Sequence, residues 1–200
     1  MKQSSDYRAH FKKADPKIYE LSKKFKLEPI VDSGNYFEKL CDIIIGQQLS
    51  GKVADVIFAR FKTLFPSGKI TPKAVLKLTD LQIRNIGTSN SKAAFIKDLA
   101  RKVETGEISF EDIGSLSDEE ITGMLTEVHG IGPLTVEMFL MFSLGRPDVF
   151  STGDLGLLRA VEKIYGLEEP SKQEREALSL KWSPFRSFAA RLLWKSLDNR

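Results

Sequence analysis

Apolar residues recur at spacings of three and four along almost the whole chain, and short breaks at glycine, proline, serine and threonine separate the periodic stretches. No window alternates apolar and polar residues for long enough to predict a strand. The chain contains no internal repeat, long linker or low-complexity tract. The pattern therefore predicts an all-α protein.

Two helices are predicted in the first third of the chain. The apolar positions that follow Tyr36 predict a mostly buried helix that reaches Gln47. A second helix is expected from about Ser50. Its predicted apolar face contains Val53, Val56, Ile57, Phe61 and Leu64.

Three helix starts are predicted from capping residues. Thr71-Pro72 and Ser183-Pro184 are each typical of an N-cap followed by proline at the first helical position, where the missing amide is not needed. The segment 117–120 has the serine and glutamate spacing of a capping box.

The composition argues against a membrane protein, a secreted protein and a metal site built from cysteine or histidine. With 200 residues, of which 42% are hydrophobic and 28% charged, the chain suits a globular fold of one or two domains. No stretch is apolar enough for a membrane span and no secretion leader is recognisable, so we expect an intracellular protein. The single cysteine, Cys41, is interpreted as a buried structural thiol and excludes a cysteine-ligated metal site. The two histidines, His10 and His129, are too few for a metal cage.

The net charge of +3 is unevenly distributed. The stretch from Glu104 to Glu120 is acidic, whereas residues 181–200 are basic, with Asp198 as their only acid. Such a distribution suits a polyanionic partner, and it also fits an ordinary solvated surface.

The segment 125–139 predicts two helices joined by the tight turn Gly130-Ile131-Gly132, with Pro133 opening the second helix. Amide hydrogens at that helix N-terminus would point outward and form an anion site, while Ile131 would fill the space between the helices. An ordinary helical corner is the alternative. The longer pattern from Leu125 to Thr135 is more specific and favours phosphate binding.

This segment resembles the hairpin of the helix-hairpin-helix DNA repair glycosylases. In that family the hairpin amides hold a DNA phosphate, often with a monovalent cation bound by backbone carbonyls. The resemblance implies that Gly130, Gly132 and Thr135 contact DNA. It also implies that any Na⁺ or K⁺ would be held by the carbonyls of Thr126, His129 and Ile131.

Asp154 follows a short apolar crossing and stands at the head of a predicted helix. Taken alone, it is a typical N-cap. In the family, however, an aspartate at this interval after the hairpin is the catalytic residue. The segment from Asp148 to Leu155 resembles the 3-methyladenine DNA glycosylase II branch, as do Ile44–Ser50 and Trp182–Trp194.

The resemblance spans about residues 35 to 197 and implies a bilobal helical fold with the active-site cleft between two lobes. One lobe would comprise residues 1–34 and 146–200, and the other residues 35–145. We expect no separate N-terminal sheet domain and no organic cofactor.

One carboxylate suffices for the implied chemistry. Asp154 would stabilise the positive charge that develops on the sugar as the N-glycosidic bond breaks. An alkylated purine is already cationic, so it leaves without the second acid that O-glycosidases need. Bifunctional relatives carry lysine just before the hairpin threonine, where this chain has Leu134. A Schiff base is therefore not available there, and we predict a monofunctional enzyme without lyase activity.

Gln48 is the first candidate for a wedge that fills the stack after the base flips, and Leu49 is the second. A polar helix end is the alternative for this segment, which continues to Ser50. Phe37, Phe185 and Phe188 either line the site or belong to the core. The resemblance places Leu134, Met138, Leu155 and Trp194 in the base pocket.

Broadly acting relatives have tryptophan at the position of Leu134, so the aliphatic side chain bears on substrate range. The sequence thus predicts a monomeric glycosylase that removes alkylated purines from double-stranded DNA. The rival hypothesis is a non-catalytic module that recognises abasic or distorted DNA.

Overall fold

The computed structural model describes residues 3–29, 32 and 34–198. Within these ranges the chain forms twelve α-helices and two 3-10 helices, with no strand, so the predicted all-α fold is confirmed. The α-helices are α1 (Gln3–Ala14), α2 (Pro16–Lys24), α3 (Tyr36–Gly46), α4 (Gly51–Thr63), α5 (Pro72–Lys77), α6 (Asp80–Asn85), α7 (Asn90–Glu104), α8 (Asp118–Thr126), α9 (Pro133–Phe142), α10 (Leu155–Tyr165), α11 (Lys172–Ser179) and α12 (Arg186–Asp198). The 3-10 helices are η1 (Ile113–Ser115) and η2 (Leu180–Trp182).

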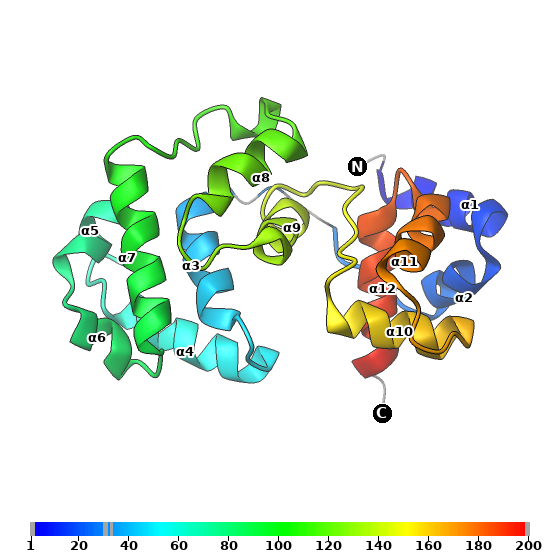
Figure 1. The fold of residues 1–200 in the computed structure, drawn as a ribbon, viewed down its shortest axis with the longest axis horizontal. Coiled ribbons are helices and arrows are strands. Elements are labelled where there is room, and N and C mark those ends of the chain that lie inside the picture. The colour runs from blue at the N-terminus through cyan, green and yellow to red at the C-terminus, as the bar shows by residue number, and fades with distance from the viewer. Residues whose placement is uncertain (1–2, 30–31, 33, 199–200) are drawn as a thin grey trace. The chain divides into compact units, whose positions relative to one another are not determined.

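The chain divides into two compact units, and each is described by itself. The first unit consists of Met1–Asp32 and Leu140–Arg200, and it contains α1, α2, α10, α11 and α12. The second unit is Ser33–Phe139, from α3 to the first turns of α9. The same helices are labelled in Figure 1.

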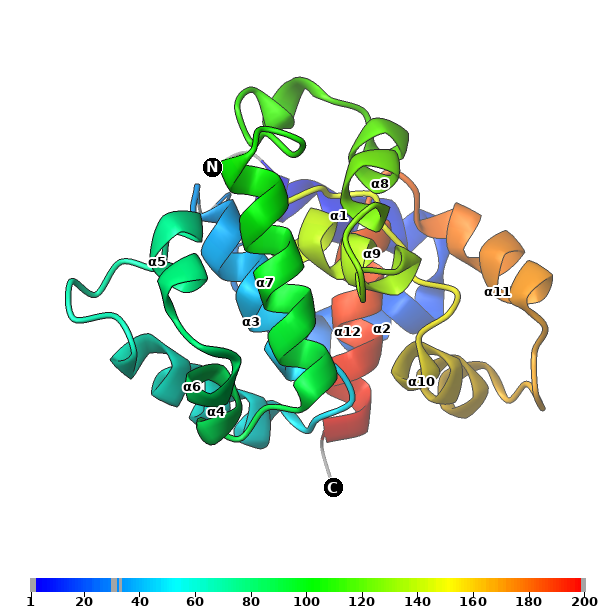
Figure 2. The ribbon, with the colours of Figure 1, turned by 60° about the vertical axis from the view of Figure 1, so that its left-hand side comes forward.

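The second unit is organised around α7, which packs against α3, α5 and α6 (Figures 1 and 2). The buried side of α7 includes Ala93, Ile96 and Leu99. Leu40 and Ile44 of α3 are also fully buried. Removal of this apolar surface from water is the main stabilising contribution to the unit.

The first unit contains a buried carboxylate, that of Asp15. Asp15 caps α2 by accepting hydrogen bonds from the amides of Lys17 and Ile18. Its Oδ2 atom also accepts from Trp182 Nε1 at 2.9 Å and from the Tyr165 hydroxyl at 2.5 Å. Burial and the neighbouring Asp15 raise the pKa of Tyr165 well above its ordinary value. A buried carboxylate is costly unless it is hydrogen-bonded, and these four donors satisfy it.

Two of the three predicted helix starts are confirmed. Thr71 accepts a hydrogen bond from the amide of Ala74, with Pro72 at the first position of α5. Ser117 and Glu120 form the reciprocal capping box that opens α8. Both signals act within one helical turn, so local spacing is enough to identify them.

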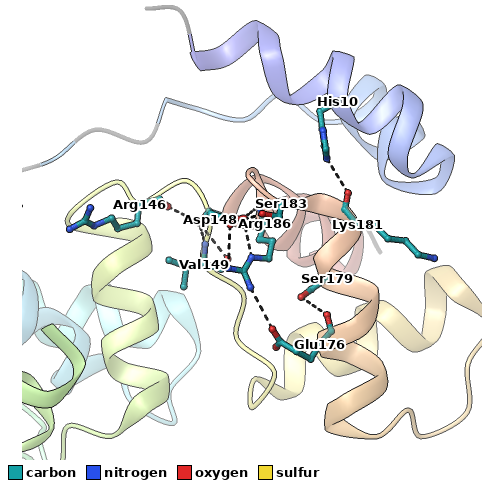
Figure 3. A network of polar contacts seen from close by, with 10 residues as sticks. His10, Arg146, Asp148, Val149, Glu176, Ser179, Lys181, Ser183 and Arg186 are labelled. Atoms are coloured by element: carbon teal, nitrogen blue, oxygen red, sulfur yellow. Dashed lines mark hydrogen bonds and ion pairs between the residues drawn. The ribbon is translucent and has the colours of Figure 1, made fainter. Parts of the chain in front are cut away.

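The third predicted start, at Ser183-Pro184, is wrong. The peptide bond between these residues is cis, and α12 begins only at Arg186. The first amide of α12 donates instead to Asp148 Oδ1, at 3.1 Å. Figure 3 shows Ser183 and the Arg186 guanidinium converging on this carboxylate, and Glu176 beyond Arg186. Burial alone would raise the pKa of Asp148, but the hydrogen bonds from Arg186 and Ser183 hold it below its ordinary value.

The predicted apolar face of α4 is only partly buried. Ile57 and Phe61 lie in the core. Val53 and Val56 are 45% and 51% exposed, so their helical spacing did not indicate burial. Exposed apolar residues are common on protein surfaces, and the periodicity of a sequence does not distinguish them from core residues.

Candidate active site

The hairpin of the second unit is built as the sequence predicts. It runs from the end of α8 at Thr126 to the start of α9 at Pro133, and Ile131 is buried between them. Gly130 has φ +81°, and a Cβ there would lie 2.1 Å from the ring of Phe95. An added Cβ at Gly132 would meet nothing within 4 Å. The first glycine is therefore needed for packing, whereas the second leaves the surface of the turn open.

The backbone carbonyls of the hairpin fall into two groups. Those of Leu125 and Val128 accept amides of the turn, and that of Gly132 accepts the amide of Val136. Gly130 O accepts from a side chain, Gln47 Nε2. Among the described residues, no hydrogen bond ends on the carbonyl oxygen of Thr126, His129 or Ile131. These are the three oxygens that the resemblance assigns to a cation, and the donor set of neutral carbonyls suits Na⁺ or K⁺.

Asp98 of α7 supports the hairpin from behind. Its Oδ2 atom accepts the His129 amide at 3.0 Å and lies 3.1 Å from His129 Nδ1. Burial works to raise the pKa of Asp98, but hydrogen bonds from His129 and Arg101 outweigh it and lower the pKa. The imidazole of His129 is otherwise largely exposed.

The predicted wedge segment, residues 47–50, forms a sharp turn between α3 and α4, the wedge turn. Gln48 is exposed and has φ +58°, a left-handed conformation that costs a non-glycine residue about 1 kcal/mol or more. Leu49 is 37% exposed, and its amide donates to Gly46 O at 3.1 Å. Ser50 is the N-cap position of α4. The turn therefore presents Gln48 and Leu49 outward on a strained backbone.

Gln47 joins this turn to the hairpin, a role that sequence reasoning missed. Its Nε2 atom donates to Gly130 O at 2.8 Å and to Thr135 Oγ1 at 3.1 Å. The partners are more than 80 residues away in the chain, so no local spacing announces them. Thr135 itself is buried, and its hydroxyl faces Gln47.

Lys92 is a second residue that sequence reasoning missed. Its Nζ atom donates to Ile45 O at 2.8 Å and to Gln47 O at 2.7 Å. One sequence signal was present, because a lysine in the first turn of a helix opposes the helix dipole. An ammonium group at this position is stabilised by acceptors outside its own helix, and here these are the carbonyls at the end of α3.

In the first unit, Asp154 caps α10 through a single oxygen. Oδ1 accepts the Leu157 amide at 2.7 Å and Trp194 Nε1 at 2.8 Å. Oδ2 accepts no hydrogen bond from the described residues. Asp154 is thus both the N-cap that its position predicts and a carboxylate with one oxygen available to another molecule.

The indole of Trp194 approaches Asp154 because residue 156 is a glycine. A Cβ on Gly156 would lie 2.9 Å from Asp154 Oδ1 and 3.1 Å from Trp194 Nε1. A glycine is less favourable in a helix than alanine, by up to about 1 kcal/mol in the helix interior, so its presence in α10 is a sequence signal for a close contact. The ring of Trp194 packs against the half-exposed Phe142, with centroids 5.9 Å apart.

The residues expected in the base pocket are distributed between the two units. Leu155 and Trp194 belong to the first unit, beside Asp154. Leu134 and Met138 belong to α9 in the second unit, where Leu134 is exposed and Met138 half-buried. Of the three phenylalanines considered, Phe37 and Phe188 are buried in the cores, and Phe185 packs against His10 and Phe188.

The all-helical fold, the glycine hairpin and the Asp154 carboxylate at the start of α10 are the features of a protein of the helix-hairpin-helix class. Comparison with known families agrees, because residues 41–185 match the HhH-GPD superfamily base excision DNA repair protein family. The match covers more than half of the chain, so this protein belongs to the HhH-GPD superfamily.

Several of the similar proteins are named as DNA-3-methyladenine glycosylases. The chain is 36% identical over 163 residues to DNA-3-methyladenine glycosylase 1 of Schizosaccharomyces pombe, which is 80% of this chain and 72% of that protein. The structure of the Schizosaccharomyces pombe 3-methyladenine DNA glycosylase Mag1 in complex with abasic DNA is 31% identical, with a TM-score of 0.87 over 95% of both chains. A Bacillus halodurans DNA-3-methyladenine glycosidase structure is 30% identical, with a TM-score of 0.83 over 98% of this chain and 91% of that one.

Three curated relatives extend beyond the matched region. The chain spans between 62% and 72% of their length. Among the residues that the structure describes, no helix is long and apolar enough to cross a membrane.

Proposed function

We propose that this protein is a base excision repair glycosylase that hydrolyses the N-glycosidic bond of alkylated purines of the 3-methyladenine type in duplex DNA. The observation that carries the proposal is the Asp154 carboxylate, whose Oδ1 is held by Leu157 and Trp194 while Oδ2 accepts nothing from the described residues. Membership of the superfamily and the names of the relatives support the same reaction class.

The chemistry requires one carboxylate. As the bond between the sugar and the base nitrogen breaks, its electron pair leaves with the base and neutralises the positive charge of the alkylated ring. The sugar becomes oxocarbenium-like, and the Asp154 carboxylate stabilises that charge electrostatically. Water then adds to the sugar carbon and passes its extra proton to the surrounding solvent, which leaves an abasic site with a hydroxyl group on that carbon. Because Oδ1 is held by two donors, the carboxylate does not need to reorient during the reaction.

The hairpin and the wedge turn bind the DNA. The open surface at Gly132 allows a phosphate to approach the amides at the start of α9, where the helix dipole favours an anion. A monovalent cation on the carbonyls of Thr126, His129 and Ile131 would add positive charge beside that phosphate. Gln48, with Leu49 beside it, fills the space that the flipped nucleotide vacates. All of these residues come from one chain, so we take a monomer as the working form.

The enzyme is further proposed to be monofunctional. The position just before Thr135 holds Leu134, and an aliphatic side chain cannot form the Schiff base through which a lysine cuts the strand. The product is then an intact strand with an abasic site.

A duplex with one 3-methyladenine tests both statements. The purified protein should release the base in a single turnover, and the strand should break only after alkaline treatment. An undamaged duplex of the same sequence is the control. Tight binding without base release would support the rival, a non-catalytic DNA-binding module, and strand breaks before alkaline treatment would show lyase activity.

A further inference from the structure

Three residues on one side of α7 reach the two turns that the proposed function assigns to DNA. Lys92, Phe95 and Asp98 follow one another at intervals of three positions, which places them along the same side of a helix. Lys92 contacts the wedge turn, whereas Phe95 and Asp98 contact the hairpin. A single rigid helix therefore touches both turns.

Lys92 holds the wedge turn by its backbone. Its ammonium group donates to the carbonyls of Ile45 and Gln47, at the end of α3, where carbonyls have no partner within the helix. These hydrogen bonds are charge-assisted and stronger than those between neutral groups. They fix the backbone directly before Gln48, whose left-handed conformation needs support from its surroundings.

The hairpin is held by the same helix and by the wedge turn itself. The ring of Phe95 lies against Gly130, so that no side chain fits between them. Asp98 accepts the amide of His129, the residue that precedes Gly130. Gln47 connects the wedge turn to the hairpin. Its side chain donates to Gly130 O and Thr135 Oγ1, and its carbonyl accepts from Lys92.

We propose that Lys92 is a positioning residue that, through Gln47, holds the wedge turn at a fixed spacing from the hairpin, so that phosphate binding brings Gln48 to the base stack. This inference rests on the proposed function, since it assigns a task within base flipping. The hairpin grips the phosphate independently of this link, so loss of Lys92 reduces flipping and leaves the affinity for undamaged DNA in place.

Lys97 is a matched control on the same helix. It also donates from Nζ to two backbone carbonyls, those of Leu76 and Leu78 at the end of α5. Both lysines are half-buried, and neither has a salt bridge among the described residues. If Lys92 served only to cap a helix, then removing either lysine would have the same kind of effect.

The first experiment needs no DNA. Hydrogen exchange is compared in the wild-type protein and in the variants Lys92→Met, Lys97→Met and Lys92→Arg. The Lys92→Met variant should exchange faster in residues 46–50, whereas residues 129–132 should keep their protection because Asp98 and Phe95 hold the hairpin. Lys97→Met should match the wild type in both segments, and Lys92→Arg should restore protection in residues 46–50 because a guanidinium also offers several donors. Unchanged exchange in Lys92→Met, or equal changes in both methionine variants, would overturn the proposal.

The second experiment measures the functional consequence. A duplex with 2-aminopurine beside the lesion reports flipping by fluorescence, and single-turnover excision is followed in parallel. Lys92→Met should lower flipping and excision by about tenfold to a hundredfold, the scale expected when a positioning group shifts a reacting element by an ångström. Affinity for undamaged duplex should stay constant, and Lys97→Met should act like the wild type.

Equal flipping in Lys92→Met and wild type would overturn the positioning role. A wild-type protein that excises no alkylated base would instead contradict the proposed function, and the exchange experiment would still decide whether Lys92 holds the wedge turn in place.

Discussion

The two candidate functional regions of this protein, the turns of the second unit and Asp154 in the first, are held in place in opposite ways. In the second unit, side chains hold backbone: Lys92, Gln47 and Asp98 all bond to main-chain groups, and the surface they leave open consists of turns. In the first unit, backbone and indole N–H groups hold one side chain, Asp154, by one oxygen. We therefore expect DNA binding by the turns to depend mainly on their backbone shape. Base excision should depend mainly on the negative charge of Asp154.

The largest expected effect follows from removing that charge. Asp154→Asn retains an Oδ1 atom that can accept from Leu157 and Trp194, so the cap on α10 should survive. Excision of 3-methyladenine should fall by about a hundredfold or more, the scale for losing one strong electrostatic stabiliser. Single-turnover kinetics measure the loss, and duplex affinity should be retained. Near wild-type excision by the asparagine variant would show that another group stabilises the sugar.

A pair of glycine substitutions tests the claim that shape decides the turns. Gly132→Val adds a side chain into open space, before a proline where β-branched residues fit the extended backbone. The protein should fold normally but bind all duplexes about tenfold more weakly or worse, because one set of charge-assisted hydrogen bonds is blocked.

Gly130→Ala is the contrasting variant. Its Cβ would collide with Phe95, and its φ of +81° is unfavourable for alanine, so thermal stability should drop. Filter binding and thermal unfolding separate the two effects. Wild-type affinity in a well-folded Gly132→Val protein would mean that the hairpin does not face DNA.

A smaller effect is expected from the choice of lesion. With Leu134 and Met138 at the positions where the resemblance predicts aromatic stacking, selectivity should depend on the weakness of the glycosidic bond itself. We expect 3-methyladenine to be excised at least about tenfold faster than hypoxanthine, whose departure needs protonation that one carboxylate does not supply. Single-turnover rates under identical conditions make the comparison. A preference for hypoxanthine would reveal a general acid elsewhere in the site.

The smallest predicted effect concerns Trp194. Trp194→Phe keeps a ring against Phe142 but removes the N–H that donates to Asp154. The loss of one hydrogen bond of about 1 kcal/mol corresponds to a roughly fivefold slower excision. The Michaelis constant should change little, because the carboxylate remains in place but is held by the Leu157 amide alone. If the rate is unchanged, the indole serves only for packing.

Much of this protein was predictable from short stretches of its sequence. The spacing of apolar residues determined the helical fold, Thr71 and Ser117 marked helix starts, and the glycines with Pro133 marked the hairpin. These signals are local, because caps, turns and helical periods depend on residues within one or two turns of the chain. The motif around Asp154 likewise indicated an N-cap, which the structure contains.

Only the tertiary structure decided which distant groups complete these local features. Asp148 caps α12 in place of Ser183, Lys92 and Gln47 hold the wedge turn, and Trp194 holds Asp154. Each pairing joins residues about 40 or more positions apart. Hydrogen bonds of this kind depend on where packing brings two surfaces together, and a helix presents the same donors and acceptors whichever neighbour it packs against.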